Sequence, residues 1–148
     1  MSTIELSQTE ADALFKMKKI RLNVEHHEYP NRGGSLRIPL VSKNKRETFM
    51  LDITRGRIDL SQGTLQNRAR QVFILARLDY NGPPHINPDG TEIPCPHLHL
   101  YREGYGDKWA VSVPAEYFKL INDRWETLQD FMKFCNITKK PIITKESF

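Results

Sequence analysis

A proline-rich segment at residues 81–96 constrains the fold of this chain more than any other stretch. Its sequence, NGPPHINPDGTEIPCP, contains five prolines and two glycines in sixteen residues. Proline fixes the backbone angle φ and lacks an N–H donor, so this segment excludes a regular helix or a central strand. Asn81-Gly82 and Asp89-Gly90 are turn dipeptides. We therefore expect a stiff loop that presents His85 near its tip.

Stretches with the two-residue period of β-strands lie on both sides of this loop. Before it, apolar and polar residues alternate in short segments separated by polar turns, which is the pattern of β-hairpins: residues 20–24, 36–40, 49–53 and 58–60. Residues 71–80, QVFILARLDY, form an apolar run rich in β-forming residues and predict a central strand. After the loop, residues 97–101 and 108–113 predict a final strand pair.

Capping residues predict a helix before the first strand. Ser7 and Glu10 have the spacing of a capping box, in which each side chain bonds to the backbone of the other residue. The predicted helix runs from about Gln8 to Lys19.

The C-terminal third predicts further helix. Pro114 suits a first helical turn, and the apolar residues after it recur at spacings of three and four. Asp123 and Glu126 can start a second helix, so the pattern leaves open whether there are one or two. The Pro-broken tail after residue 136 is expected either to be frayed or to lie along the surface.

Together these elements predict an α+β fold. It consists of a twisted, mainly antiparallel sheet of about five to seven strands, with an N-terminal helix and one or two C-terminal helices packed on it. The sequence has no internal repeat and no linker, so residues 1–148 are expected to form a single domain. A domain of this length can bury roughly 70% of its unfolded surface and needs no disulfide or bound metal to fold.

Composition excludes several protein classes. The chain is 39% apolar, and no run approaches the ~20 apolar residues of a membrane span. Its N-terminus lacks the layout of a signal peptide, and two cysteines are too few for a disulfide framework. We therefore expect a cytoplasmic protein with no membrane partner.

Basic residues are concentrated in the first half of the chain. The whole chain has a net charge of +4, but residues 31–77 hold ten Lys or Arg side chains against three acidic ones. Such a field attracts a nucleic-acid backbone, where each neutralised phosphate releases counterions. Four arginines are the expected backbone-binding groups, with the last two on one strand face: Arg55, Arg57, Arg68 and Arg70. A solubility role for the charge is the alternative.

Histidines give the sharpest functional signal. Three of the five histidines in the chain, His85, His97 and His99, lie within fifteen residues. In the run HLHLY, the two-residue side-chain period of a strand places His97, His99 and Tyr101 on one face. The loop that carries His85 can fold back over the strand that carries the other two.

This constellation suits general acid–base chemistry on RNA. Cleavage requires a 2′-hydroxyl to lose a proton, a 5′-oxygen to gain one and a pentacovalent phosphate to be neutralised, and paired imidazoles with a cation can do this without a metal or cofactor. The candidate catalytic residues are His85, His97, His99, Tyr101, Arg102 and Lys108. The structural alternative is that the paired histidines only hydrogen-bond their neighbours at a sheet surface.

A metal centre is a second interpretation of the same residues. The spacing of His97, His99 and Glu103 matches that by which cupin-like barrels present two imidazoles and a carboxylate to Fe, Mn or Zn. No histidine follows His99, so a third imidazole would come from His85 or from residues 25–28. Nearby, Tyr105 and Trp109 can either stack on bases or belong to the core.

The run LDYNGPPHINPDGTEIPCPHLHLYREGYGDKWA resembles an uncharacterised family of small prokaryotic and phage proteins. Two elements carry the resemblance, GPPHxNPDG and PHLHxYREGYGDKWA, and the family implies no activity. A weaker likeness, carried by the basic strand-rich body and the stretch PLVSKNK at residues 39–45, is to endoribonuclease toxins of toxin–antitoxin and abortive-infection systems.

These observations lead to three functional hypotheses. The first is an RNA-acting domain, a metal-independent endoribonuclease of a toxin or defence system that uses a histidine pair. The second is a non-catalytic interaction protein, such as an immunity protein, an antitoxin partner or a phage-encoded inhibitor. The third is a metal-binding enzyme that uses His97, His99 and Glu103.

Overall fold

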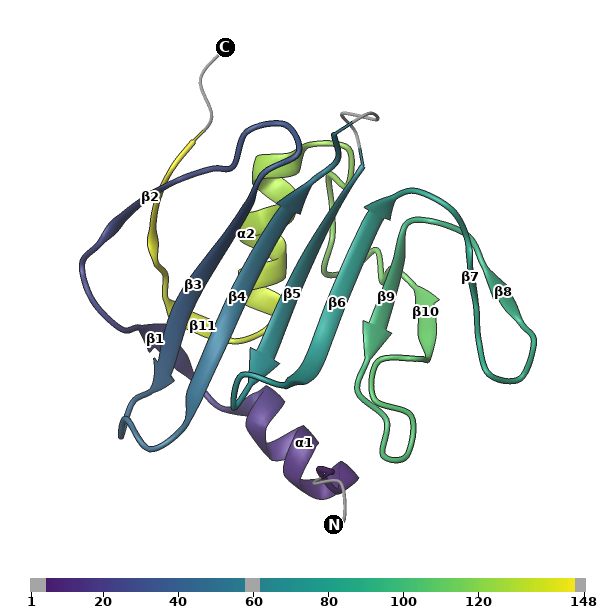
Figure 1. The fold of residues 1–148 in the computed structure, drawn as a ribbon, viewed down its shortest axis with the longest axis horizontal. Helices are drawn as coiled ribbons and strands as arrows, with labels where there is room; N and C mark the ends of the chain where they lie inside the picture. The colour runs from purple at the N-terminus through teal and green to yellow at the C-terminus, as the bar shows by residue number, and fades with distance from the viewer. Residues whose placement is uncertain (1–4, 58–61, 146–148) are drawn as a thin grey trace.

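A large, mainly antiparallel sheet forms the body of the protein in the computed structural model, which describes residues 5–57 and 62–145 (Figure 1). Within these residues the sheet has eight strands in the order β10-β9-β6-β5-β4-β3-β1-β11. Their bounds are β1 Lys19–Arg21, β3 Ser35–Ser42, β4 Thr48–Arg55, β5 Gly63–Ala69, β6 Phe73–Asn81, β9 His97–Leu100, β10 Ala110–Ser112 and β11 Ile137–Lys139. The predicted α+β class is confirmed, and the sheet is somewhat larger than expected.

Successive hairpins build the centre of this sheet. β3, β4, β5 and β6 pair antiparallel in chain order, and β9 then pairs with β6. The predicted interior position of the apolar run 71–80 is confirmed, since β6 lies between β5 and β9. The strand expected at residues 58–60 lies outside the described residues, and β5 is the next described strand along the chain.

Arg70 departs from the predicted strand face. β5 ends at Ala69, and Arg70 and Gln71 form the turn into β6 with φ values of 52° and 68°. A residue in this left-handed region no longer alternates with its strand neighbours. Arg68 and Arg70 therefore do not share a face as expected.

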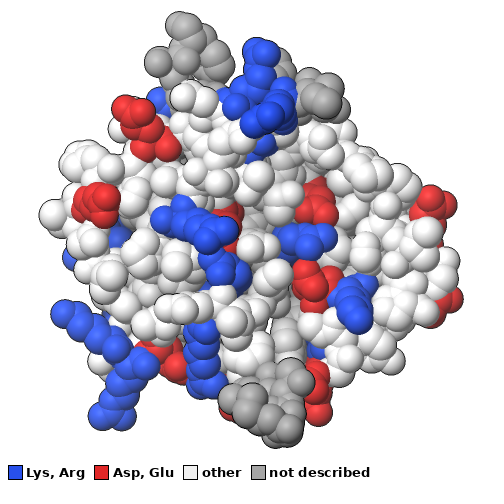
Figure 2. Space-filling view, in the orientation of Figure 1, with Lys and Arg blue, Asp and Glu red and all other residues white. Residues whose placement is uncertain are grey.

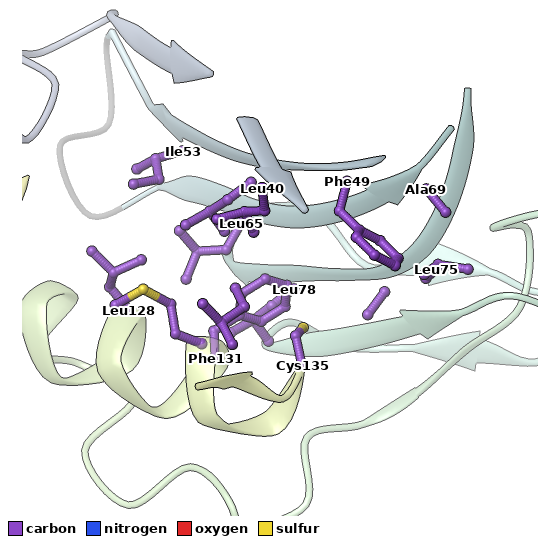
Figure 3. Packing of buried hydrophobic residues seen from close by; sticks show 14 of the residues in the cluster. Leu40, Phe49, Ile53, Leu65, Ala69, Leu75, Leu78, Leu128, Phe131 and Cys135 are labelled. Atoms are coloured by element: carbon purple, nitrogen blue, oxygen red, sulfur yellow. The ribbon is translucent and has the colours of Figure 1, made fainter. Parts of the chain in front are cut away.

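The two helices pack on the sheet. α1 (Gln8–Lys16) begins with the predicted capping box, in which Ser7 Oγ accepts from the Glu10 backbone N–H. Figure 1 shows α2 (Arg124–Phe134) behind strands β3–β5. Figure 3 shows the core between α2 and the sheet, where Leu128 and Phe131 of the helix and Cys135 at its C-cap face Leu65 and Leu78 of the strands. The opposite face of the sheet is left for polar side chains.

Residues 114–123 form turns rather than the helix expected after Pro114. Phe118 is buried and Ile121 is partly buried, so the apolar spacing reports burial without helix. Asp123 adopts an extended backbone and its side chain accepts from the Glu126 N–H, which starts the helix there. One C-terminal helix is therefore present in the described residues, and it begins at the second of the two expected starts.

The tail after α2 is ordered into strands rather than frayed. β11 pairs in parallel with β1, and β12 (Ile142–Thr144) pairs in parallel with β2 (His26–Glu28) in a separate two-stranded sheet. Lys19 also links the two helix C-termini, because its buried Nζ donates to the backbone carbonyls of Phe15, Met17 and Cys135 at 2.8, 3.0 and 2.7 Å.

The proline-rich segment folds into a small hairpin beside the β10 edge of the sheet (Figure 1). Its strands are β7 (His85–Ile86) and β8 (Glu92–Ile93). The buried Asn87 amide fixes it there, because its Nδ2 donates to the Ala110 carbonyl at 3.0 Å and its Oδ1 accepts from the Ala110 N–H at 2.8 Å. The side chain thus occupies backbone positions of an edge strand.

No helix among the described residues combines the length and the apolar character needed to cross a membrane.

Candidate active site

Strand register brings two charged residues of β6 against the two histidines of β9. In the antiparallel pair, Arg77 lies opposite His99 and Asp79 lies opposite His97. Residues that are directly opposite in adjacent strands have their side chains on the same face. All four therefore project from the face of the sheet that α2 does not cover.

The Asp79 carboxylate is the centre of this cluster. Its Oδ2 lies 3.1 Å from His97 Nε2, 3.3 Å from His99 Nε2 and 3.2 Å from Arg77 Nη2. Its Oδ1 accepts a hydrogen bond from Thr64 Oγ1 at 3.1 Å. One carboxylate thus holds side chains from β5, β6 and β9 together.

His97 has one occupied and one free ring nitrogen. Its Nε2 donates to Asp79, because an ionised carboxylate can only accept. In the neutral ring Nδ1 then carries the lone pair, and this buried atom has no hydrogen-bond partner among the described residues. His97 is only 2% exposed. A histidine held by a carboxylate on one nitrogen and unpartnered on the other has the arrangement of a general base.

His99 is held on both nitrogens. Its Nδ1 lies 2.7 Å from the carbonyl oxygen of Asp107, to which it must donate. Its Nε2 lies 3.1 Å from Arg77 Nη2, in addition to the Asp79 contact. Arg77 in turn donates through Nη1 to the Asp107 carboxylate at 2.9 Å. With a fully buried ring, His99 is locked in position.

His85 reaches the same cluster from the β7–β8 hairpin. Its ring centroid lies 4.6 Å from that of His99 and 5.8 Å from that of His97. Its Nε2 donates to the Lys108 carbonyl at 2.7 Å, which leaves Nδ1 as its second nitrogen. The expectation that this loop folds back over the other two histidines is met. His85 is half-buried and lies over two rings that are buried.

Electrostatics keep Asp79 ionised. Burial alone would raise the pKa of Asp79, but the hydrogen bond from His99 and the charge and hydrogen bond of Arg77 together hold its pKa well below its usual range. The carboxylate is therefore an anion at every physiological pH. It can stabilise a positive charge on either neighbouring imidazole.

A cleft of about 210 Å³ gives access to Asp79. It lies at the ends of β5 and β6, and its lining is part polar and part apolar: Gln62, Gly63, Thr64, Asp79, Asn81, Gly82, Pro83 and Cys95. Cys95 donates through Sγ to the Asp79 carbonyl at 3.2 Å. Burial and the neighbouring Asp79 charge raise the pKa of the Cys95 thiol, so it stays protonated. Cys95 is packed here and is not activated as a nucleophile.

The other predicted catalytic side chains do not join the cluster. Tyr101 follows the last residue of β9, and its hydroxyl donates to the Leu6 carbonyl at 2.7 Å within the core. Arg102 lies 4.1 Å from the Trp109 ring centroid. Lys108 is exposed and contributes only its backbone carbonyl. Of the six predicted residues, the structure brings together His85, His97 and His99.

The four predicted backbone-binding arginines are scattered. Arg68 makes a two-point ion pair with Asp52 at 2.6 and 2.9 Å, and Arg70 pairs with Glu47 at 2.8 Å. Arg55 donates to the Pro30 carbonyl at 3.2 Å. Arg57 is exposed at the far end of β4. Figure 2 shows Lys and Arg side chains alternating with acidic ones on the open sheet face, without one continuous basic field.

The metal-ligand set expected from the sequence differs from the structure in one residue. Glu103 Oε1 accepts from the Gln8 N–H at 2.6 Å, at the start of α1, so this carboxylate is engaged away from the histidines. The described residues that can offer a metal three ligand atoms are Asp79, His97 and His99, whose atoms lie within 4.8 Å of one another. Arg77 contacts two of these ligand atoms, however, and its guanidinium opposes a second cation there.

Sequence reasoning missed Asp79 and Arg77. The signal was present in the apolar run 71–80, whose two charged residues are spaced two apart and therefore share one strand face. A pair of opposite charges inside an otherwise apolar central strand needs partners on that face. The HLH run supplies them only if its strand pairs directly with β6.

Comparison with known proteins identifies the family and nothing closer. A family model described as "Family of unknown function (DUF6978)" matches residues 6–137, so the chain belongs to this family. Searches of curated proteins and of solved structures found no match.

Proposed function

We propose that this member of the DUF6978 family is a metal-independent endoribonuclease whose general base is His97. The observation that carries the proposal is the Asp79–His97 pair, in which Asp79 holds Nε2 while Nδ1 is left without a partner. Two further imidazoles lie within 6 Å of that ring, at centroid distances of 5.0 and 5.8 Å. This arrangement supplies a base, an acid and a cation on one face of the sheet.

The first step forms a new phosphorus–oxygen bond. His97 Nδ1 accepts the proton of an RNA 2′-hydroxyl, and the freed oxygen attacks the adjacent phosphorus. Asp79 stabilises the imidazolium that results, because its carboxylate stays ionised beside Nε2. Arg77, which is half-buried on the same face, neutralises charge on the pentacovalent phosphate.

The second step breaks the bond to the 5′-oxygen. Protonated His85 donates from Nδ1 to the leaving oxygen, while the Lys108 carbonyl holds its Nε2. The products are a 2′,3′-cyclic phosphate and a 5′-hydroxyl. Because His85 lies over the buried rings in the closed form, the β7–β8 hairpin lifts to admit RNA to His97 and then closes again, which returns His85 to the Lys108 carbonyl before it donates.

His99 is a positioning residue in this proposal. Both of its nitrogens are engaged, and it aligns Asp79, Arg77 and the Asp107 loop. We place the activity in a toxin or defence system of the cytoplasm. This assignment to a toxin or defence system is supported by the weak likeness to endoribonuclease toxins.

The test is incubation of the purified protein with total cellular RNA, with and without EDTA. We expect chelator-resistant cleavage with cyclic phosphate ends, and a loss of at least ~100-fold in His97→Asn and in His85→Asn. His26→Asn is the matched control, because His26 lies exposed on β2, in the two-stranded sheet that β2 forms with β12. Intact RNA, or cleavage that survives both substitutions, would refute the proposal, and cleavage abolished by EDTA would favour the metal centre.

The burial of His97 and His99 favours a second candidate, the non-catalytic interaction protein. In that case the polar cluster holds the hairpin, and the hairpin presents Ile86, which is 66% exposed, to a protein partner such as a toxin or antitoxin. A tight stoichiometric complex without RNA turnover, lost in Ile86→Asp, would establish this function instead.

A further inference from the structure

An aromatic pair lies on the loop between β9 and β10. The rings of Tyr105 and Trp109 meet edge to face, with centroids 5.7 Å apart and an interplanar angle of 86°. The Arg102 guanidinium lies 4.1 Å from the Trp109 ring centroid. Tyr105 is 44% exposed, and Trp109 Nε1 has no hydrogen-bond partner among the described residues. The loop thus exposes aromatic surface at Tyr105, whereas Trp109 is half-buried and its Nε1 is enclosed.

This aromatic pair is held directly beside the candidate active site. Asp107 and Lys108, the two residues directly before Trp109, bind the imidazoles through their backbone. The Asp107 carbonyl accepts from His99, and the Lys108 carbonyl accepts from His85. The backbone that carries Trp109 is therefore fixed relative to the histidine cluster. Trp109 is thus one residue from the carbonyl that binds His85, the residue proposed to donate to the leaving oxygen.

This loop carries two cations and two carboxylates, and only the cations remain available to a ligand. Its two carboxylates are already engaged, Glu103 by the Gln8 N–H and Asp107 by Arg77. Its two cations, Arg102 and Lys108, have exposed side chains, and the Arg102 guanidinium lies against the Trp109 ring. Aromatic rings beside cations are the chemistry that binds single-stranded nucleic acid, where bases stack and the backbone is neutralised.

We propose that Tyr105 and Trp109 bind an unpaired base next to the phosphate that is cleaved, while Arg102 and Lys108 contact the flanking phosphates. This inference rests on the proposed endoribonuclease function and names its substrate as single-stranded RNA. Base pairing would hide the stacking face inside the duplex, so the loop discriminates against double-stranded RNA.

The test uses Trp109 as its own probe. The chain has two tryptophans, so Trp125→Phe leaves Trp109 as the only fluorescent indole. The ligand is a mixed-sequence 2′-O-methyl RNA hexamer, which cannot be cleaved by attack of a 2′-hydroxyl, offered single-stranded or as a duplex. We expect the single strand to quench Trp109, the duplex to bind at least tenfold more weakly, and Tyr105→Ala to weaken binding about tenfold.

Tyr117→Ala is the matched control, because Tyr117 is 50% exposed on residues 114–123, outside the β9–β10 loop. Equal affinity of Tyr105→Ala and its parent, absence of quenching, or duplex binding as tight as single-strand binding would each overturn the inference. On cleavable RNA, Tyr105→Ala should raise KM about tenfold and leave kcat within about twofold. Quenching without any cleavage of cellular RNA would refute the proposed function but support the base site.

Discussion

At the scale of single residues, Asp79 determines how the site is held together. Its carboxylate is shared by Arg77, His97 and His99, and its pKa lies well below the ordinary value of 3.8. A carboxyl group whose pKa is depressed by folding adds stability above its unfolded pKa and loses that contribution as the pH falls toward the folded value. The stability that Asp79 contributes to the fold should therefore be lost as the solution becomes acidic.

We predict that Asp79→Asn lowers the free energy of unfolding by about 2 kcal/mol at neutral pH, since it removes charge-assisted hydrogen bonds from three partners. Urea unfolding should also show the parent losing more stability than Asp79→Asn between about pH 5 and about pH 2.5. Asp12→Asn is the control, because Asp12 is exposed and its Oδ1 contact with Gln8 suits an amide. Parallel pH profiles for parent and Asp79→Asn would contradict this account.

Lys19 has an equally specific role at the level of residues. Burial lowers the pKa of Lys19 to about 8, so it is still an ammonium at neutral pH and has three N–H groups for its three carbonyl partners. Two of those partners, Met17 and Cys135, are the C-terminal caps of α1 and α2. A cation there offsets the negative ends of both helices.

Replacing Lys19 by Met should therefore destabilise the protein by about 3 kcal/mol, because three backbone carbonyls lose their donor in the interior. Lys18→Met, one position away on an exposed side chain, should change the free energy of unfolding by less than about 0.5 kcal/mol. Thermal or urea unfolding measures both. Equal effects of the two substitutions would show that the buried ammonium contributes nothing specific.

At the scale of elements, local patterns predicted what depends on neighbours in the chain. The capping box of α1 and the interior β6 strand follow from spacing within ten residues. The helix expected after Pro114 is absent, because the same spacing of apolar side chains also buries Phe118 from a turn. The strands of the tail were missed because β11 and β12 form by pairing with β1 and β2, more than one hundred residues earlier.

The β7–β8 hairpin is the element whose position decides access to the histidines. We predict that Asn87→Ala, which removes both hydrogen bonds to Ala110, lowers stability by about 2 kcal/mol and speeds hydrogen exchange of the Ala110 amide and of the imidazole rings. NMR exchange rates measure this loosening. Asn23→Ala, on an exposed loop, should leave those rates unchanged, and unchanged rates in Asn87→Ala would show that other contacts hold the hairpin.

At the scale of the whole molecule, the candidate site exists only because of long-range pairing. Sequence reasoning grouped His85, His97 and His99, which lie close together in the chain, and the structure does bring them together. It did not find Asp79 or Arg77, since nothing local says that β9 pairs with β6 in the register that places them opposite the histidines. It also placed Tyr101 in the site, but β9 ends at Leu100 and the ring turns to the core.

The Asn87 contact also bears on how this protein meets other chains. A strand at the edge of a sheet is a template on which a second chain can add its own strand. At Ala110 both backbone groups are already taken by the Asn87 amide, so a chain pairing there must first displace the hairpin. Sheet extension at this edge and exposure of the buried histidines are therefore one event, and a partner that adds a strand to β10 would also control the site.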